Sequence, residues 1–303
     1  MINSHFTHQL SILLSIFICF APAQAETPGP SATDTLRILT YNIGRPDDSS
    51  FGRFGSFIRG EASATARSEA ILALLREQDA DVIALQEVTP VFLSALEEQK
   101  WRPQYHLEHT LSDSQLSEAP YFLQDPDGMA ILSKSRCPVT AVYNRSLHSG
   151  YLARRMLMIT LPMNGDSLRL ATCHLESGRG YGEIRAQQLE TFFEKLAPHD
   201  NAVLLGDFNF RDGQQPETSA LHQEFRDPGL ELIKNGPIST FHGLPGRRFD
   251  RILLRSKDWE TVDIQLFGKE PVMIDGEKHL ASDHYGVVAT LRRTGSRAAR
   301  RFK

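Results

Sequence analysis

One short segment, Gly206 to Asp212, carries the residues with the clearest chemical potential. Four apolar residues, 202–205, predict a buried strand, and Gly206 then ends this regular apolar pattern. Asp207 and Asn209 are two positions apart, so on an extended backbone their side chains point to the same side. Oxygen-bearing side chains at the end of a buried strand suit a site for a hard cation and a phosphate. Taken alone, however, the segment is more typical of an Asx-rich turn.

Other predicted strands also deliver polar side chains at their ends. The apolar patterns predict strands over the ranges 36–42, 81–87, 129–133, 156–161, 168–174, 202–207, 249–254 and 286–291. Four of these end in Asn42, Glu87, His174 and Asp207, and Ser-Asp-His (282–284) precedes the last one. Because rigid strand ends can hold a preorganised site, this joint placement favours a single active site.

Each of these side chains has a simpler explanation when it is considered alone. Glu87 could cap the helix that follows its strand, and His174 could be a satisfied histidine of the core. Asp250 could pair with the neighbouring Arg251, and the Ser-Asp-His segment could be a turn that leads into the last strand. One common site explains all of them together, which these separate explanations do not.

The residue types indicate metal-assisted hydrolysis. Glu87, Asp283 and Asn42 offer oxygen ligands of the kind that suits Mg²⁺ or Mn²⁺. The cysteines and histidines show no spacing typical of a zinc site. Asp207 can serve as a general base on water, and Asn209 can orient that water or a phosphate oxygen.

The remaining polar residues suit the binding of a phosphate in its transition state. A protonated His284 can stabilise the added charge of a pentacovalent phosphate, with Asp250 holding its imidazole in position. His174, Ser177 and Arg211 can donate hydrogen bonds to the non-bridging oxygens.

Strands and helices alternate too loosely for a simple parallel, doubly wound sheet. Helices are predicted over 62–78, 90–99 and 182–196. Two sheets packed face to face with helices outside suit this order better. No internal repeat or linker divides the region, so we predict one domain over 34–292.

The N-terminal segment is typical of a targeting signal. An apolar run over 10–21 precedes Ala23-Gln24-Ala25, the small-x-small pattern of signal peptidase sites. We expect a signal peptide at 1–25, cleavage after Ala25, and an exported protein, periplasmic or secreted; a short membrane anchor or a misplaced start are the alternatives. Residues 26–33 predict a flexible lead-in.

The bulk composition is that of an ordinary globular protein. The chain is 41% hydrophobic and 23% charged. Its net charge of −4 argues against a protein coated with nucleic acid over its whole surface, but it leaves room for a local basic cleft. The tail 293–303 is rich in arginine and predicts either a solvated end or a contact with nucleic acid or anionic lipid. Cys137 and Cys173 are not a disulfide framework, although one bridge between them stays open.

Four motifs in fixed order resemble the endonuclease/exonuclease/phosphatase superfamily. They are Tyr-Asn-Ile-Gly (41–44), Leu-Gln-Glu-Val (85–88), Gly-Asp-Phe-Asn (206–209) and Ser-Asp-His (282–284). The resemblance covers roughly residues 36–291. It implies a four-layer α/β sandwich, with two packed mixed β-sheets flanked by helices, and Mg²⁺-dependent phosphoester hydrolysis.

Longer stretches are similar to the 5′-tyrosyl-DNA phosphodiesterases within that superfamily. They are His-Leu-Glu-Ser-Gly-Arg-Gly (174–180), Asn-Phe-Arg-Asp (209–212), Arg-Phe-Asp-Arg-Ile (248–252) and Ser-Asp-His-Tyr-Gly (282–286). The resemblance implies a metal role for Asn42 and Glu87, and it places Phe241 where an aromatic contact to the DNA end is expected. It implies a role in hydrolysis for Asp207, Asn209 and His284. It implies contact with the phosphate or the DNA end for His174, Ser177 and Arg211.

The leading hypothesis is therefore an exported, Mg²⁺-dependent phosphodiesterase that acts on DNA ends as a monomer. A secreted nuclease is one alternative. A lipid or small-molecule phosphodiesterase, held at an anionic surface by the basic tail, is another. A binding protein on an inactive scaffold is disfavoured, because no member of the expected acid, base and metal set is missing.

Overall fold

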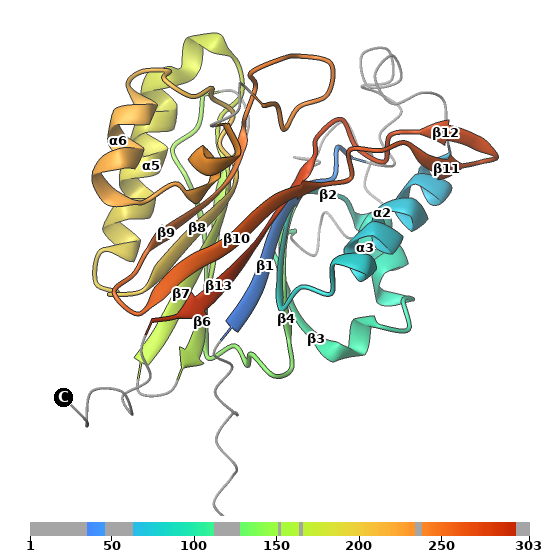
Figure 1. Cartoon of the computed structure of the whole chain (residues 1–303), viewed down its shortest axis with the longest axis horizontal. Coiled ribbons are helices and arrows are strands. Elements are labelled where there is room, and N and C mark those ends of the chain that lie inside the picture. The colour runs from blue at the N-terminus through green and yellow to red at the C-terminus, as the bar shows by residue number, and fades with distance from the viewer. Residues whose placement is uncertain are drawn as a thin grey trace, which may run out of the picture. The chain divides into compact units, whose positions relative to one another are not determined.

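Two β-sheets pack face to face between two layers of helices in the computed structural model of the chain (Figure 1). The structure describes residues 35–45, 63–111, 128–150, 153–163, 166–233 and 238–294. All of these residues belong to one unit, Ala32–Lys303. The arrangement confirms the predicted four-layer α/β sandwich.

The first sheet has six strands, in the order β10-β13-β1-β2-β4-β3. β1 and β2 are parallel, and the other neighbouring strands pair antiparallel, so the sheet is mixed. Its strands are β1 (Thr35–Asn42), β2 (Val82–Val88), β3 (Tyr105–His109), β4 (Gly128–Lys134), β10 (Trp259–Phe267) and β13 (Gly286–Arg293).

The second sheet has five strands, in the order β5-β6-β7-β8-β9. Only β7 and β8 pair in parallel. Its strands are β5 (Ala141–Ser146), β6 (Arg155–Met163), β7 (Asp166–His174), β8 (Ala202–Asp207) and β9 (Asp250–Arg255). A separate hairpin joins β11 (Val272–Ile274) to β12 (Glu277–His279).

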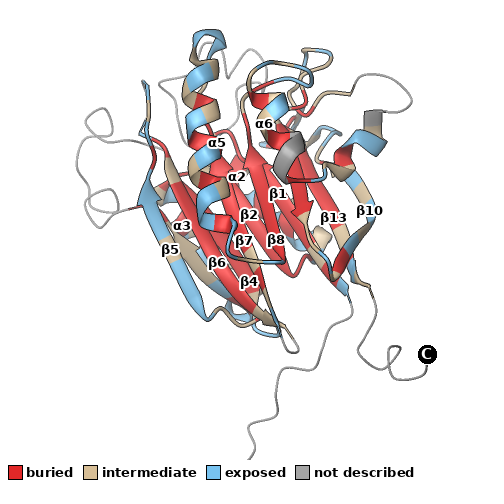
Figure 2. Cartoon of the chain, turned by 90° about the vertical axis from the view of Figure 1, so that its left-hand side faces the viewer, coloured by how far each residue is buried: buried red, intermediate tan, exposed pale blue. Residues whose placement is uncertain are grey.

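Helices cover the outer face of each sheet. α2 (Ala64–Gln78) and α3 (Pro90–Glu97) lie beside the first sheet, whereas α5 (Gly182–Leu196) and α6 (Glu217–Glu224) cover the second (Figures 1 and 2). Short 3₁₀ turns complete the described helical elements at Arg102–Gln104, Arg179–Tyr181 and Pro228–Ile233. None of the helices in the described ranges is long and apolar enough to span a membrane.

The caps of two helices follow from local sequence. The Ser63 hydroxyl accepts a hydrogen bond from the Ala66 N–H at the start of α2, and the Thr89 hydroxyl accepts one from the Phe92 N–H at the start of α3. The cap of α3 is therefore Thr89. This leaves the nearby Glu87 carboxylate without the capping role that its position in the sequence had suggested.

Alternation along the strands sorts the apolar side chains into separate cores. On β1, Leu36 and Ile38 face the second sheet, whereas Leu39 and Tyr41 face the helices α2 and α3. A third apolar cluster lies between the second sheet and α5. The central strands are buried on both faces (Figure 2), so the ends of β1, β2, β7 and β8 are held on a rigid support.

A buried polar contact joins the two sheets. Gln86 Nε2 on β2 donates to the hydroxyl of Thr172 on β7 at 3.0 Å and to that of Thr40 on β1 at 3.1 Å. All three side chains are fully buried. Because an unsatisfied buried amide is costly, this contact fixes how the sheets lie against each other directly beneath the strand ends.

The predicted strands and helices are present in the described residues, with bounds that differ by a few positions. Sequence patterns missed β5 and β10, because most of their side chains are exposed or half-buried and no apolar run marks them. They also missed β3, β11, β12 and α6. Cys137 and Cys173 are free thiols, so the bridge left open above does not form. The predicted signal peptide, the lead-in and tail residues 295–303 lie outside the described residues.

Gly206 lies within β8, which has the predicted bounds, at a close approach to β7. Its φ of +140° is open to glycine and strained for other residues. A Cβ at this position would lie 2.0 Å from the backbone oxygen of Cys173. Only glycine therefore lets β7 and β8 bring His174 and Asp207 together at their ends.

The substitution Gly206→Ala is expected to lower the free energy of unfolding by at least about 3 kcal/mol, because backbone atoms must shift to admit the methyl group. Urea denaturation followed by circular dichroism measures this. Gly180→Ala is the matched control, since nothing lies within 4 Å of its added Cβ. A loss for Gly206→Ala no larger than that of the control would contradict the packing argument.

Candidate active site

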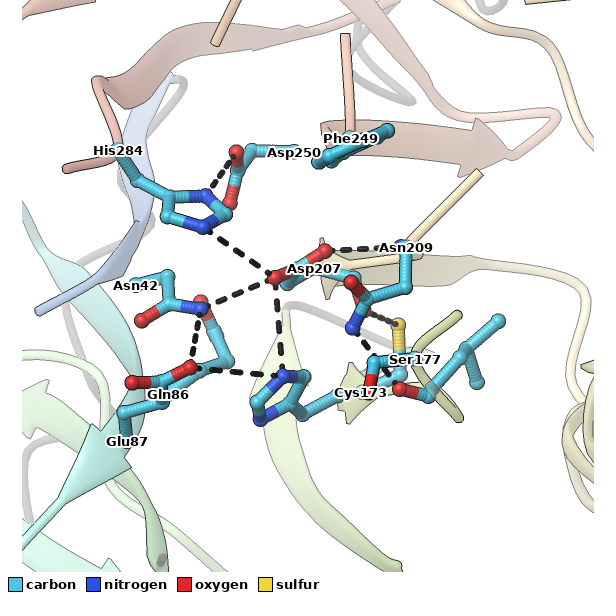
Figure 3. Close-up of polar contacts among 12 residues, drawn as sticks. Asn42, Gln86, Glu87, Cys173, Ser177, Asp207, Asn209, Phe249, Asp250 and His284 are labelled. Atoms are coloured by element: carbon cyan, nitrogen blue, oxygen red, sulfur yellow. Dashed lines mark hydrogen bonds and ion pairs between the residues drawn. The ribbon is translucent and has the colours of Figure 1, made fainter. Parts of the chain in front are cut away.

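The polar strand ends from the two sheets meet at one place. Asn42 and Glu87 come from β1 and β2 of the first sheet, and Asp207 comes from β8 of the second (Figure 3). His174 comes from β7, also of the second sheet. In each sheet the two strands are parallel neighbours, so their carboxyl ends lie side by side. The structure thus brings these four predicted site residues together.

Asn42 links the two sheets within the site. Its Nδ2 donates to Asp207 Oδ2 at 3.0 Å and to Glu87 Oε1 at 3.2 Å. Its Oδ1 accepts the backbone N–H of Gly44 at 3.0 Å, which fixes the orientation of the amide. In this geometry the Asn42 amide nitrogen positions two carboxylates, one from each sheet.

Glu87 lies in a bulge at the end of β2. The pairing of β2 with β4 shifts register between Gln86 and Val88, so Glu87 is the extra residue. Its φ is +59°, a left-handed conformation that is unusual for glutamate. Arg45 Nε lies 3.9 Å from its Oε2. Strain of this kind at a strand end is typical of a functional position, because the bulge re-aims the side chain.

Asp207 and Asn209 meet through a turn and not through an extended strand. Asn209 has a φ of +54°, and its backbone N–H donates to Asp207 Oδ1 at 2.8 Å. Its side-chain amide donates to the Leu175 carbonyl at 3.0 Å. The prediction from extended geometry was wrong in this detail, and the Asx turn that the sequence offered as an alternative is itself part of the site.

His284 is held as a cation between two buried carboxylates. Its Nδ1 lies 2.8 Å from Asp250 Oδ2, and its Nε2 lies 3.8 Å from Asp207 Oδ2. Burial alone would lower the pKa of His284, but the charges of Asp250 and Asp207 outweigh it and raise that pKa from 6.5 to about 10. Asp250 therefore pairs with His284, and not with the adjacent Arg251.

His174 is neutral, in contrast. Burial and the positive charges of Arg154, His284 and Arg45 hold its pKa well below 6.5. Arg154 Nη1 lies 2.9 Å from His174 Nδ1. Because a guanidinium only donates, Nδ1 accepts and the proton stays on Nε2, which lies 3.7 Å from Asp207 Oδ2. Sequence reasoning missed Arg154, because no motif marks this residue and its burial directly before β6 is visible only in the structure.

Two places near Asp207 could receive a divalent cation. Within the described part of the chain, Asp207, Asp250 and His284 have ligand atoms within 4.8 Å of one another. A protonated His284 is a poor ligand, because metal-binding imidazoles are neutral. Glu87 is a hard oxygen donor with a partly exposed side chain, and so it fits Mg²⁺ better. Asp283, also predicted as a ligand, is half-buried with its carboxylate 3.4 Å from the Ser282 hydroxyl.

The remaining predicted residues lie around the site and not at its centre. Ser177 follows Leu175, whose carbonyl accepts from Asn209, and Arg211 is exposed beyond Asn209. Phe241 packs edge-on against the His284 ring, with centroids 5.0 Å apart. Phe249, which sequence reasoning did not include, contacts the same ring at 6.5 Å.

The model of the Endonuclease/Exonuclease/phosphatase family matches residues 39–284. The chain belongs to this family.

Curated relatives of one kind match at low identity. Tyrosyl-DNA phosphodiesterase 2 of Homo sapiens is 27% identical over 243 residues, covering 74% of this chain and 63% of that protein. The Danio rerio protein of the same name is 28% identical over 242 residues, covering 74% of this chain and 61% of its own length. This chain thus spans less than two thirds of the length of these relatives.

Solved structures share the fold. A Danio rerio tyrosyl-DNA phosphodiesterase 2 humanised by 14 mutations has a TM-score of 0.66 at 22% identity, covering 86% of this chain and all of that one. The catalytic domain of human Nocturnin with bound sulfate has a TM-score of 0.65 at 17% identity, covering 86% of this chain and 95% of that one.

The substitution Asp250→Asn is expected to lower the pKa of His284 strongly, because burial remains while the largest favourable charge is lost. In the unchanged protein the imidazolium should persist up to about pH 10. Two-dimensional NMR of ¹⁵N-labelled histidine in metal-free protein measures both. A His284 that loses its proton near pH 6.5 in the unchanged protein would contradict the assigned charge state.

Proposed function

We propose that this protein is a Mg²⁺-dependent phosphodiesterase that hydrolyses phosphoester bonds at DNA ends. One observation carries the proposal: the buried carboxylate of Asp207 lies between the cationic His284 and the neutral His174. In such an arrangement the carboxylate can accept a proton from the attacking water, and the two histidines can stabilise the negative charge that develops on the phosphate.

In the proposed mechanism Asp207 accepts a proton from the attacking water. Hydrogen bonds from the Asn42 side chain and the Asn209 backbone each engage one of its carboxylate oxygens, which holds the carboxylate in a single orientation. The water oxygen bonds to phosphorus, and the bond to the leaving oxygen breaks. Asn209 also orients the water or a phosphate oxygen.

The histidines act on the charge that develops on the phosphate. The His284 imidazolium, held by Asp250, faces the added negative charge of the pentacovalent state. The Nε2–H of His174 donates to a non-bridging oxygen, with its tautomer fixed by Arg154. Ser177 and Arg211 supply further donors to the phosphate, and each such group is typically worth about 2–4 kcal/mol in the barrier.

Glu87 would hold the Mg²⁺ ion, with Asn42 and Asp283 completing the set of nearby oxygen donors. The ion supplies Lewis-acid polarisation of the phosphate and stabilisation of the leaving oxygen. The bulge and the left-handed backbone at Glu87 support this role, because they re-aim the carboxylate, which lies 3.2 Å from Asn42 Nδ2 and 3.8 Å from His174 Nε2.

The substrate class rests on the relatives and on the surroundings of the site. The similar proteins are named as tyrosyl-DNA phosphodiesterases, and one similar structure, from D. rerio, is described as a complex with a single-strand DNA product. Phe241 and Phe249, beside His284, offer ring faces on which a base or sugar can pack. These features support a DNA end over a lipid headgroup.

The substitution Asp207→Asn is expected to reduce hydrolysis of a 5′-phosphotyrosyl oligonucleotide by at least about a thousandfold, because the amide cannot accept the proton. Initial rates at fixed Mg²⁺ measure this. Asp200→Asn, an exposed aspartate paired with Lys257, is the matched control and should retain full activity.

The same assay separates the substrate classes. Intact plasmid, sphingomyelin and a phosphoinositide are offered beside the phosphotyrosyl oligonucleotide. We expect the oligonucleotide end to be hydrolysed fastest. Faster cleavage of plasmid would indicate an endonuclease, and faster turnover of either lipid would indicate a lipid phosphodiesterase. Full activity of the Asp207→Asn variant would contradict the assignment of Asp207 as the general base.

Glu87→Gln is expected to weaken the binding of Mg²⁺ by about tenfold or more, since a neutral amide replaces the charged ligand. Isothermal titration with Mg²⁺ and with Mn²⁺ measures the affinity directly. Glu190→Gln, on the exposed face of α5, controls for the loss of one negative charge. Equal affinities in the two variants would remove Glu87 from the metal site.

A further inference from the structure

A cavity of about 530 Å³ lies next to the proposed reaction centre. Asn209 lines it, and so do Phe241 and Phe249, the two rings that contact His284. The cavity is therefore continuous with the site and is open to the same substrate. The proposed mechanism uses only the edge of this cavity.

Three arginines on the cavity wall have no carboxylate partner among the described residues. They are Arg179, Arg211 and Arg247, which come from three different segments of the chain. Burial, followed by the charges of Arg211 and Arg179, lowers the pKa of Arg247, as expected for like charges close together. A cluster of unpaired cations around a hollow favours an anionic ligand.

A fourth arginine gives independent support. Arg185 also lines the cavity and is fully buried. Its Nε bonds to Glu217 at 2.8 Å, and its Nη1 bonds to the carbonyls of Glu176 and Gly178 at 2.9 and 2.8 Å. Its Nη2, however, has no hydrogen-bond partner in the described structure. A buried guanidinium nitrogen left without an acceptor is costly, and a bound anion would satisfy it.

Two neighbouring arginines, in contrast to the first three on the cavity wall, are buried and paired with carboxylates. Arg248 forms ion pairs with Asp212 and Asp227, and Arg251 pairs with the same two carboxylates. These pairs neutralise the layer behind the cavity. The wall that faces the cavity is left with an excess of positive charge.

We propose that this cavity binds a second phosphate of the substrate, adjacent along the strand to the phosphate that is hydrolysed. Arg179 and Arg247 contact that second phosphate, and Phe241 and Phe249 pack against the nucleoside between the two phosphates. The inference rests on the proposed function and sharpens its substrate class. It selects substrates that carry at least two phosphates, such as oligonucleotide ends, over esters with a single phosphodiester.

Two small chromogenic esters test this inference. One is thymidine 5′-(4-nitrophenyl phosphate), and the other carries an additional phosphate on the 3′ oxygen. The second ester should show a kcat/KM at least about tenfold higher, mainly through a lower KM, because charge-assisted hydrogen bonds to the arginines add binding energy. In Arg247→Gln and in Arg179→Gln this ratio should fall toward one.

Arg145→Gln is the matched control, because it removes a positive charge from the exposed edge strand β5. It should keep the ratio of the unchanged protein. Equal kcat/KM values for the two esters in the unchanged protein would overturn the inference, and so would a ratio that survives in both cavity variants.

If neither ester is hydrolysed, the proposed function fails, and binding then decides the cavity alone. Isothermal titration with thymidine 3′,5′-bisphosphate and with thymidine 5′-monophosphate should show about tenfold tighter binding of the bisphosphate. Arg247→Gln should abolish that difference. Equal binding of the two nucleotides would overturn the inference independently of any turnover.

Discussion

The site depends on how the two sheets pack against each other, because the Asn42 side chain connects carboxylates from both sheets. Its amide donates to Glu87 on its own sheet and to Asp207 on the opposite sheet. Below it, the buried Gln86 amide reaches Thr172 across the same interface. A small shift between the sheets would break both contacts, so close packing of the apolar core between them holds the site in register.

Within that frame, charge distribution separates the roles of two histidines that the sequence presents alike. His284 lies between two carboxylates and keeps its proton, whereas His174 lies beside Arg154 and stays neutral. The same buried environment favours opposite protonation states because the nearest charges have opposite signs. Asp207 thus has a cationic donor on one side and a neutral donor on the other.

Around the centre, the arginines divide into two groups with different consequences. Arg248 and Arg251 are tied to Asp212 and Asp227, and they anchor the segment that follows Asn209. Arg179, Arg211 and Arg247 on the cavity wall have no such partner among the described residues. The first group makes the loop rigid, and the second gives the adjacent cavity its affinity for anions.

The sequence by itself determined the layered fold and the polar residues at the strand ends, because alternation and strand length are local properties of the chain. It did not reveal β5 or β10, whose side chains are mostly exposed or half-buried, nor the bulge and the left-handed backbone at Glu87. Only the tertiary structure decided which groups meet: Asn42 and Asp207 are 165 positions apart in sequence. It also decided the partner of His174 and the grouping of unpaired arginines, since such contacts depend on how sheets and loops pack and leave no periodic signal in the chain.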